Sequence, residues 1–278
     1  MTNPGPASCV LTWQAVRTLA LVVAVLATVG CAAVPGGSGQ IGTRTDMVTD
    51  SDETELRKRA RIRVELAVSY FEEGQTTIAL DEIKQALVTD PNYTEAFNLR
   101  GLIYMRLNDT RQAEDSFRRA LLLRPGDPNV LHNYGWLVCQ QARYAEATQM
   151  FSQALADPQY GERPKTLMTL GLCQIRAGQS ADAEASLTRS YELDAGNPIT
   201  GYNLASMMYQ RSEFGRAQFY VRRINNSALA NAESLWLGIK VERRLNNADA
   251  TEQLATQLRK RFGQSREAGL LDRGAFNE

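Results

Sequence analysis

Residues 94–127 read TEAFNLRGLIYMRLNDTRQAEDSFRRALLLRPGD, and in this stretch Gly101 is followed twelve positions later by Ala113. The same pairing of a small residue with alanine recurs every 33–36 residues along the chain. The other pairs are Ala67/Ala79, Gly135/Ala147, Gly171/Ala183, Ala205/Ala217 and, more weakly, Gly238/Ala250. A period of this length is typical of a solenoid built from pairs of helices. The sequence therefore predicts an all-α array that offers an extended binding surface.

Each position in the repeated pattern has a physical role. Glycine or alanine within the first helix lets the second helix approach closely, and the alanine of the second helix does the same from the other side. The apolar residue four positions later, such as Phe117, fills the space between neighbouring pairs. A proline such as Pro125 ends the second helix and begins the turn. Because one pair cannot bury its apolar face alone, the stack of pairs supplies the core.

The pattern resembles the tetratricopeptide repeat (TPR), which implies a superhelix of helix–turn–helix units. We expect the helical region to cover residues 55–264 and a capping tail to cover residues 265–278. The register gains two residues around 160–163, which predicts a changed local twist and a division of the array into two groups of three. The six predicted repeats are residues 60–93, 94–127, 128–163, 164–197, 198–230 and 231–264.

The composition excludes several function classes. The 278 residues carry 31 Lys plus Arg against 31 Asp plus Glu, so net charge gives no reason to expect a nucleic-acid partner. His132 is the single histidine, which disfavours a multi-histidine metal site and a histidine-dependent triad. The sequence has no glycine-rich phosphate loop and no nucleophile elbow. We therefore expect a binding protein without a cofactor, a metal, a small-molecule substrate or enzymatic activity.

The N-terminal region has the pattern of an export signal. Residues 18–29 form an apolar run of twelve, which is too short to span a bilayer but suits a secretory signal. The run leads into Thr28-Val29-Gly30-Cys31, which resembles a bacterial lipoprotein cleavage box. The resemblance implies a signal peptide over residues 1–30, a lipid on Cys31 and, because Ala32 follows, attachment to the outer membrane. The alternative is an ordinary signal cleaved near Ala33, or an uncleaved anchor.

Residues 31–54 are predicted to form a flexible tether between the lipid and the repeats. Glycines and Pro35 prevent regular structure there, and apolar side chains are sparse. Acylation would hold the protein stably at the membrane, since each buried methylene contributes about 0.8 kcal/mol.

The first helices of TPR units form the concave face of the array, and this face is predicted to be apolar here. It lacks the lysine, asparagine and arginine pattern that clamps a carboxylate, so we expect it to bind an amphipathic or extended apolar segment. Repeats one to three are the favoured site, and repeat five contributes Tyr202, Ser206 and Tyr209 to the same face. The alternative is that the protein's own helices cover several of these side chains. The candidate groove residues are Val64, Val68, Phe71, Asn98, Leu102, Met105, His132 and Trp136.

Cys139 and Cys173 lie on the first helices of adjacent predicted repeats. Two buried free thiols are the favoured interpretation, and a disulfide in an oxidising compartment is the alternative. His132, on the groove face, is predicted to be a hydrogen-bonding residue and not a metal ligand.

The layout of signal, tether, six repeats and short tail resembles the PilF/PilW family, the TPR pilotins of type IV pili. Residues 96–101 and 132–137 carry the clearest similarity to that family's second and third repeats. The resemblance implies an outer-membrane lipoprotein that binds secretin subunits and promotes their localisation or assembly into multimers. The alternative is a TPR lipoprotein scaffold for peptidoglycan-synthesis or other cell-envelope enzymes.

Overall fold

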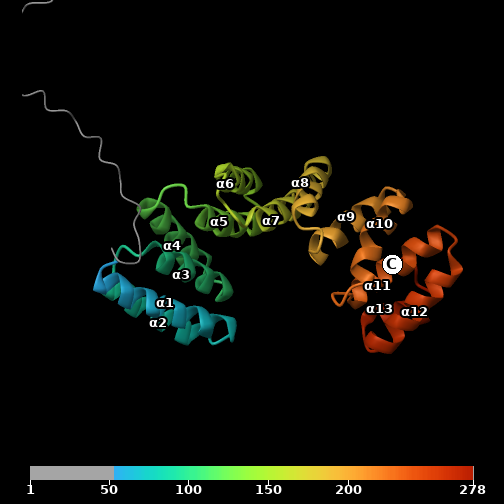
Figure 1. The fold of residues 1–278 in the computed structure, drawn as a ribbon, viewed down its shortest axis with the longest axis horizontal. Coiled ribbons are helices and arrows are strands. Elements are labelled where there is room, and N and C mark those ends of the chain that lie inside the picture. Colours follow the sequence, from blue (N-terminus) through green and yellow to red (C-terminus); the bar gives the residue numbers. More distant parts are fainter. Residues whose placement is uncertain (1–52, 278) are drawn as a thin grey trace, which may run out of the picture. The chain divides into compact units, whose positions relative to one another are not determined.

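The computed structural model describes residues 53–277, which fold into thirteen helices and contain no strand. Twelve helices form six consecutive pairs, and a short thirteenth helix follows them (Figure 1). The predicted all-α TPR fold is confirmed. The pairs are α1 (Glu55–Glu72) with α2 (Thr76–Thr89), α3 (Thr94–Arg106) with α4 (Thr110–Leu123), α5 (Pro128–Gln140) with α6 (Tyr144–Ala156), α7 (Arg163–Arg176) with α8 (Ser180–Leu193), α9 (Pro198–Gln210) with α10 (Phe214–Asn225), and α11 (Ala232–Arg244) with α12 (Ala248–Phe262). The last helix is α13 (Arg266–Asp272).

Local sequence signals explain where the helices begin. The Asp127 side chain accepts hydrogen bonds from the backbone N–H groups of residues 129 and 130, and Pro128 occupies the first helical position of α5. Asn197 and Pro198 repeat this arrangement at α9. The first helix starts at Glu55, ahead of the repeat pattern, because Thr54 caps it by accepting from the N–H of Arg57.

The recurring small residues mark the points where paired helices come closest. A Cβ atom placed on Gly101 would lie 2.5 Å from the Phe117 ring, and one on Gly171 would lie 2.6 Å from Leu187. Phe117 and Leu187 are both fully buried. Glycine is therefore required at these positions because the second helix places a large side chain against the first.

The turn inside each repeat uses one residue in the left-handed backbone region. This position is occupied by glycine in two repeats, by asparagine in two, by alanine in one and by serine in one. The residues are Gly74, Asn108, Ala142, Gly178, Ser212 and Asn246. Alanine and serine adopt this region at an energetic cost, whereas glycine does not.

The buried core runs through the stack without a break at the predicted division. Leu170 and Cys173 of the fourth repeat belong to the same apolar cluster as Phe151 and Leu137 of the third. The expectation that the insertion divides the array into two groups is therefore wrong. The extra residues form a turn that is tied back to the third repeat, where Arg163 donates hydrogen bonds to the carbonyls of Leu155 and Asp157 at 2.6 and 3.1 Å.

The last helix covers the end of the stack. Leu270 and Leu271 of α13 are buried against Leu235, Ile239 and Leu258 of the sixth pair. Without α13 these side chains would expose apolar surface to solvent, as the terminal unit of any repeat array does unless it is capped.

Candidate functional site

First helices of neighbouring repeats contact one another in two runs. Helix α1 contacts α3, α3 contacts α5 and α5 contacts α7, and near the C-terminus α9 contacts α11. We call this surface the first-helix face. The predicted groove residues lie on α1, α3 and α5 of this face. A pocket lies between α9, α11 and α13.

Two predicted groove residues are covered by the protein itself. Val64 is 8% exposed and belongs to the apolar core cluster of repeats one and two. His132 is 7% exposed, and its Nδ1 lies 2.8 Å from Oγ1 of Thr166 on α7. Burial, with a smaller effect from Lys165, lowers the pKa of His132 to about 4, so the ring is neutral near pH 7. Both residues therefore pack the array and present little surface to a partner.

Four of the remaining predicted residues are half-buried and apolar. Leu102 contacts two apolar core clusters, one in repeats one and two and one in repeats two to four. Met105 and Trp136 pack against the cluster of repeats two to four, and Phe71 packs against the cluster of repeats one and two. The Arg106 guanidinium lies 3.7 Å from the centre of the Phe71 ring, and that of Arg176 lies 4.7 Å from the Trp136 ring. Arginine thus shields one face of each aromatic ring by a cation–π contact.

The two other predicted residues are more polar or more exposed. Val68 is 37% exposed. The Asn133 side-chain amide donates to Oδ1 of Asn98 at 3.0 Å, which links α5 to α3 across the face. Asn98 and His132 also line a polar pocket of about 220 Å³ at the N-terminal ends of these helices.

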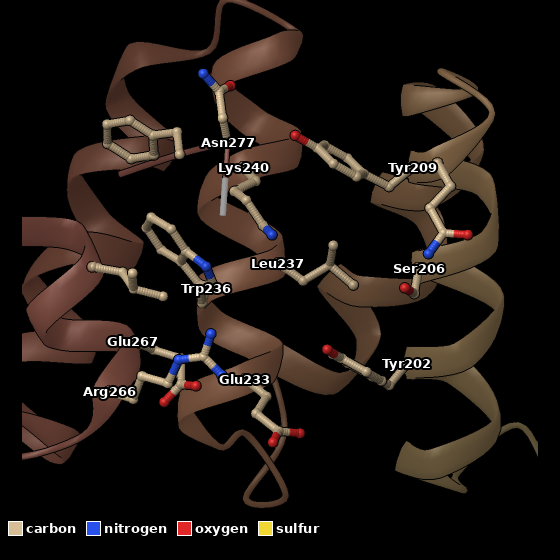
Figure 2. A pocket seen from close by; sticks show the side chains of 13 residues that line it. Tyr202, Ser206, Tyr209, Glu233, Trp236, Leu237, Lys240, Arg266, Glu267 and Asn277 are labelled. Carbon is tan, nitrogen blue, oxygen red and sulfur yellow. The ribbon is translucent and has the colours of Figure 1, made fainter. Parts of the chain in front are cut away.

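A second, larger pocket lies near the C-terminus, outside the groove predicted on repeats one to three. It has a volume of about 480 Å³ and lies between α9, α11 and α13; we call it the terminal pocket. Tyr202, Ser206 and Tyr209 of α9 face Trp236, Leu237 and Lys240 of α11 (Figure 2). The repeat register predicts Tyr202, Ser206 and Tyr209 on the inner face. It gives no such prediction for Trp236 and Lys240, because the sixth repeat matches the pattern only weakly.

The terminal pocket is lined by side chains of both charge signs beside its aromatic rings. Burial, with smaller effects from the carboxylates of Glu233 and Glu267, raises the pKa of Tyr202, so its hydroxyl remains protonated. Burial lowers the pKa of Lys240, whose Nζ lies 5.6 Å from the centres of both the Tyr209 and the Trp236 rings. Aromatic walls with charged groups at the rim suit a peptide segment.

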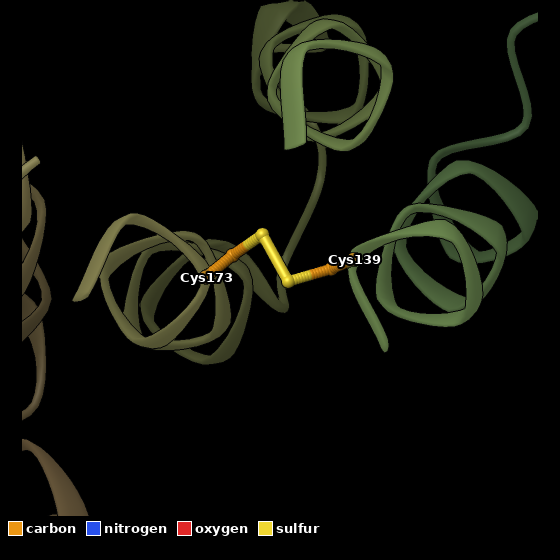
Figure 3. Close-up of a disulfide and its surroundings, with 2 residues drawn as sticks. All are labelled: Cys139 and Cys173. Carbon is orange, nitrogen blue, oxygen red and sulfur yellow. A yellow bond between two sulfur atoms is a disulfide. The ribbon is translucent and has the colours of Figure 1, made fainter. Parts of the chain in front are cut away.

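A disulfide joins Cys139 of α5 to Cys173 of α7, with the two Cα atoms 6.0 Å apart (Figure 3). The favoured expectation of two free thiols is therefore wrong. Cys139 lies four residues after Gly135 and Cys173 lies two residues after Gly171, so the repeat register does not place the two cysteines at equivalent points of adjacent first helices. The bond crosses the boundary at which the repeat spacing lengthens, so it fastens the third repeat to the fourth.

The described residues contain no cluster of three or more potential metal ligands. Across residues 53–277, none of the helices has both the length and the apolarity to cross a membrane. Cys31, the predicted signal peptide and the predicted tether up to residue 52 lie outside the described residues.

These features define an all-α TPR protein whose first-helix face presents apolar and aromatic side chains. The tetratricopeptide repeat model matches residues 94–127. The solved structure of PilW, described as a widely conserved type IV pilus biogenesis factor, is 31% identical with a TM-score of 0.68; the match covers 76% of this chain and 97% of PilW. The type IV pilus assembly protein PilF of Pseudomonas aeruginosa is 26% identical over 80% of this chain and 86% of PilF. The solved PilF structure gives a TM-score of 0.72 at 25% identity and is covered completely, by 80% of this chain.

The chain belongs to the PilF/PilW family of type IV pilus TPR proteins. The resemblance found in the sequence is confirmed.

Proposed function

We propose that this protein is a lipid-anchored outer-membrane pilotin that binds secretin subunits on its first-helix face. Membership of the PilF/PilW family supports a role in type IV pilus biogenesis. The observation that carries the binding proposal is the cluster of half-buried apolar side chains on repeats one to three, namely Phe71, Leu102, Met105 and Trp136. We propose that the protein acts by binding and catalyses no reaction.

The arrangement of this cluster suits an amphipathic segment. A few anchoring residues, often aromatic, supply most of the binding energy at a typical interface, whereas the residues around them mainly exclude water. Methionine adapts its shape to varied partner surfaces. Arg106 lies over the Phe71 ring and Arg176 over the Trp136 ring, so each of the two aromatic anchors has a cation beside it. A partner helix or strand with apolar residues on one face and carboxylates along its edge would contact both the apolar anchors and the two arginines.

The proposed lipid on Cys31 would raise the concentration of partner that the repeats meet. Two binding events joined by a short flexible link are favoured by an effective concentration that reaches the millimolar range. A secretin subunit that approaches the membrane would therefore be captured more efficiently by an anchored protein than by a free one.

Pull-down of purified secretin subunits by the immobilised protein tests the binding proposal. Replacing both Leu102 and Trp136 with alanine should weaken capture about tenfold or more, because each anchor contributes on the order of 1–2 kcal/mol. Phe219→Ala is the matched control, since Phe219 is 62% exposed on α10 and lies outside the cluster. Unchanged capture by a folded double variant would contradict a site on repeats one to three. Recovery of a peptidoglycan enzyme in place of a secretin from solubilised outer membranes would instead favour the scaffold alternative.

A further inference from the structure

The C-terminal tail places an aromatic ring in the terminal pocket. The backbone turns at Gly274, whose φ of +66° lies in the left-handed region, and Ala275 then donates a hydrogen bond to the carbonyl of Leu270 at 2.9 Å. The Phe276 ring stacks on Trp236 with the ring centres 5.3 Å apart and the planes 25° from parallel. The Arg243 guanidinium lies 3.6 Å from the centre of the same Phe276 ring.

The Phe276 ring is held by its contacts with Trp236 and Arg243. Within residues 53–277, Phe276 and Asn277 form no hydrogen bond to any residue outside the tail. Helix α13 itself is firmly packed, because Leu270 and Leu271 are buried. Movement about Gly274 would therefore release Phe276 from Trp236 while α13 stays in place.

The rest of the terminal pocket is suited to a segment of a second protein. Its volume of about 480 Å³ lies within the usual range for ligand sites. Tyr202 and Tyr209 provide further aromatic surface on α9, and Glu233 and Arg266 are exposed at the rim. Tyrosine and tryptophan are enriched at the anchoring positions of protein interfaces, and polar residues surround them. The pocket lies between α9 and α11, which are the first helices of repeats five and six, and α13.

We propose that the terminal pocket binds an extended segment of a partner protein through an aromatic side chain, which takes the place of Phe276 on Trp236. The tail then acts as a displaceable lid. The seated Phe276 identifies the chemistry that the site accepts: a flat apolar ring in contact with an indole and a guanidinium. The proposal concerns repeats five and six and does not depend on the partner being a secretin.

A peptide added in trans tests whether the site accepts such a ring. The probe is a fluorescein-labelled peptide of sequence Arg-Gly-Ala-Phe-Asn-Glu, titrated against the full chain with fluorescence anisotropy as the readout. Phe276→Ala removes the ring that competes for the site, so the variant should bind the peptide about tenfold more tightly than the unmodified chain. A change of this size corresponds to the contribution of one stacked ring with one cation–π contact. The same peptide with alanine in place of phenylalanine should not bind. Phe276→Leu is a second variant that keeps apolar cover over Trp236 and should give intermediate affinity.

Variants elsewhere locate the binding. Tyr209→Ala added to Phe276→Ala should weaken the peptide complex, whereas Phe219→Ala on α10 should behave like the unmodified chain. Equal affinity of the unmodified chain and Phe276→Ala would overturn the proposal, as would binding that does not require the peptide phenylalanine. Sedimentation of the unmodified chain as a dimer that Phe276→Ala dissociates would overturn it as well, because the pocket would then exchange tails between two copies.

Discussion

The disulfide between Cys139 and Cys173 fastens α5 to α7 at the one place where the repeat spacing exceeds 34 residues. The bond closes a loop with a sequence separation of 34. In the chain-entropy account, closing a loop of this length stabilises the folded state by about 4 kcal/mol. The third and fourth repeats therefore depend on an oxidising compartment for part of their stability.

Reduction should accordingly lower the midpoint of urea unfolding, and the change should be followed by circular dichroism with and without dithiothreitol. The variant with both cysteines replaced by serine is the control, because its midpoint should be low and should not respond to the reductant. If the unmodified protein has the same midpoint in both states, the disulfide contributes nothing to stability.

Gly101 is predicted to be the least replaceable of the small residues. Gly101→Ala would place a methyl group 2.5 Å from the buried Phe117 ring and should destabilise the fold by about 1–3 kcal/mol, even though alanine is the better helix former. Gly135→Ala is the matched comparison, since its methyl group would lie 3.0 Å from Phe151 and should cost less. Adding Phe117→Leu should recover part of the loss in Gly101→Ala. The thermal midpoints of the four proteins would rank them, and equal midpoints for the two glycine variants would refute the packing argument.

Ala142 should gain stability when it is replaced by glycine. Its φ is +61°, in the left-handed region that costs an alanine about 1–2 kcal/mol. After the greater entropy of glycine in the unfolded chain is subtracted, a net gain of about 0.5–1 kcal/mol is expected. Ala177→Gly is the control, because Ala177 has a φ of −77° and glycine there should only destabilise. Chemical denaturation of both variants gives the answer, and a loss of stability in Ala142→Gly would mean that the turn carries no strain.

His132 should make the protein less stable in acid. Its pKa is lowered from 6.5 to about 4 in the folded chain, so the unfolded chain binds a proton that the folded chain excludes. The stability is therefore complete above about pH 6.5 and falls as the pH drops towards about 4, by up to about 3 kcal/mol.

The measurement is the unfolding free energy across this interval for the unmodified protein and for His132→Asn, which retains a hydrogen-bonding group near Thr166. The variant should lose the histidine-dependent slope but keep the acid sensitivity of carboxylates such as Glu184, whose pKa is lowered mainly by a hydrogen bond from Arg211. Parallel pH profiles for the two proteins would show that His132 is not the responsible group.

The repeat pattern was sufficient to predict the helix pairs because it records a geometric requirement. Gly101 and Ala113 are small because two helices meet at them, and this constraint recurs in every unit. The same register placed Tyr202 and Tyr209 on the inner face. It also placed Val64 and His132 there, but it could not show that neighbouring helices cover them.

The terminal pocket was missed for a physical reason. Its third wall is made by α13 and Phe276, which lie outside the repeated unit and have no register to predict their contacts. The disulfide was misjudged because the sequence gives the separation of two cysteines but not the rotation of their helices. The 6.0 Å distance between the Cα atoms depends on how the third and fourth repeats pack.

The role in secretin assembly is tested most directly by the amount of secretin multimer in the outer membrane of a strain that lacks this protein. Multimers resistant to detergent should be lost in that strain, restored by the unmodified gene, and restored poorly by a gene encoding Leu102→Ala with Trp136→Ala. Normal multimer levels in the strain without the protein would contradict the proposed function.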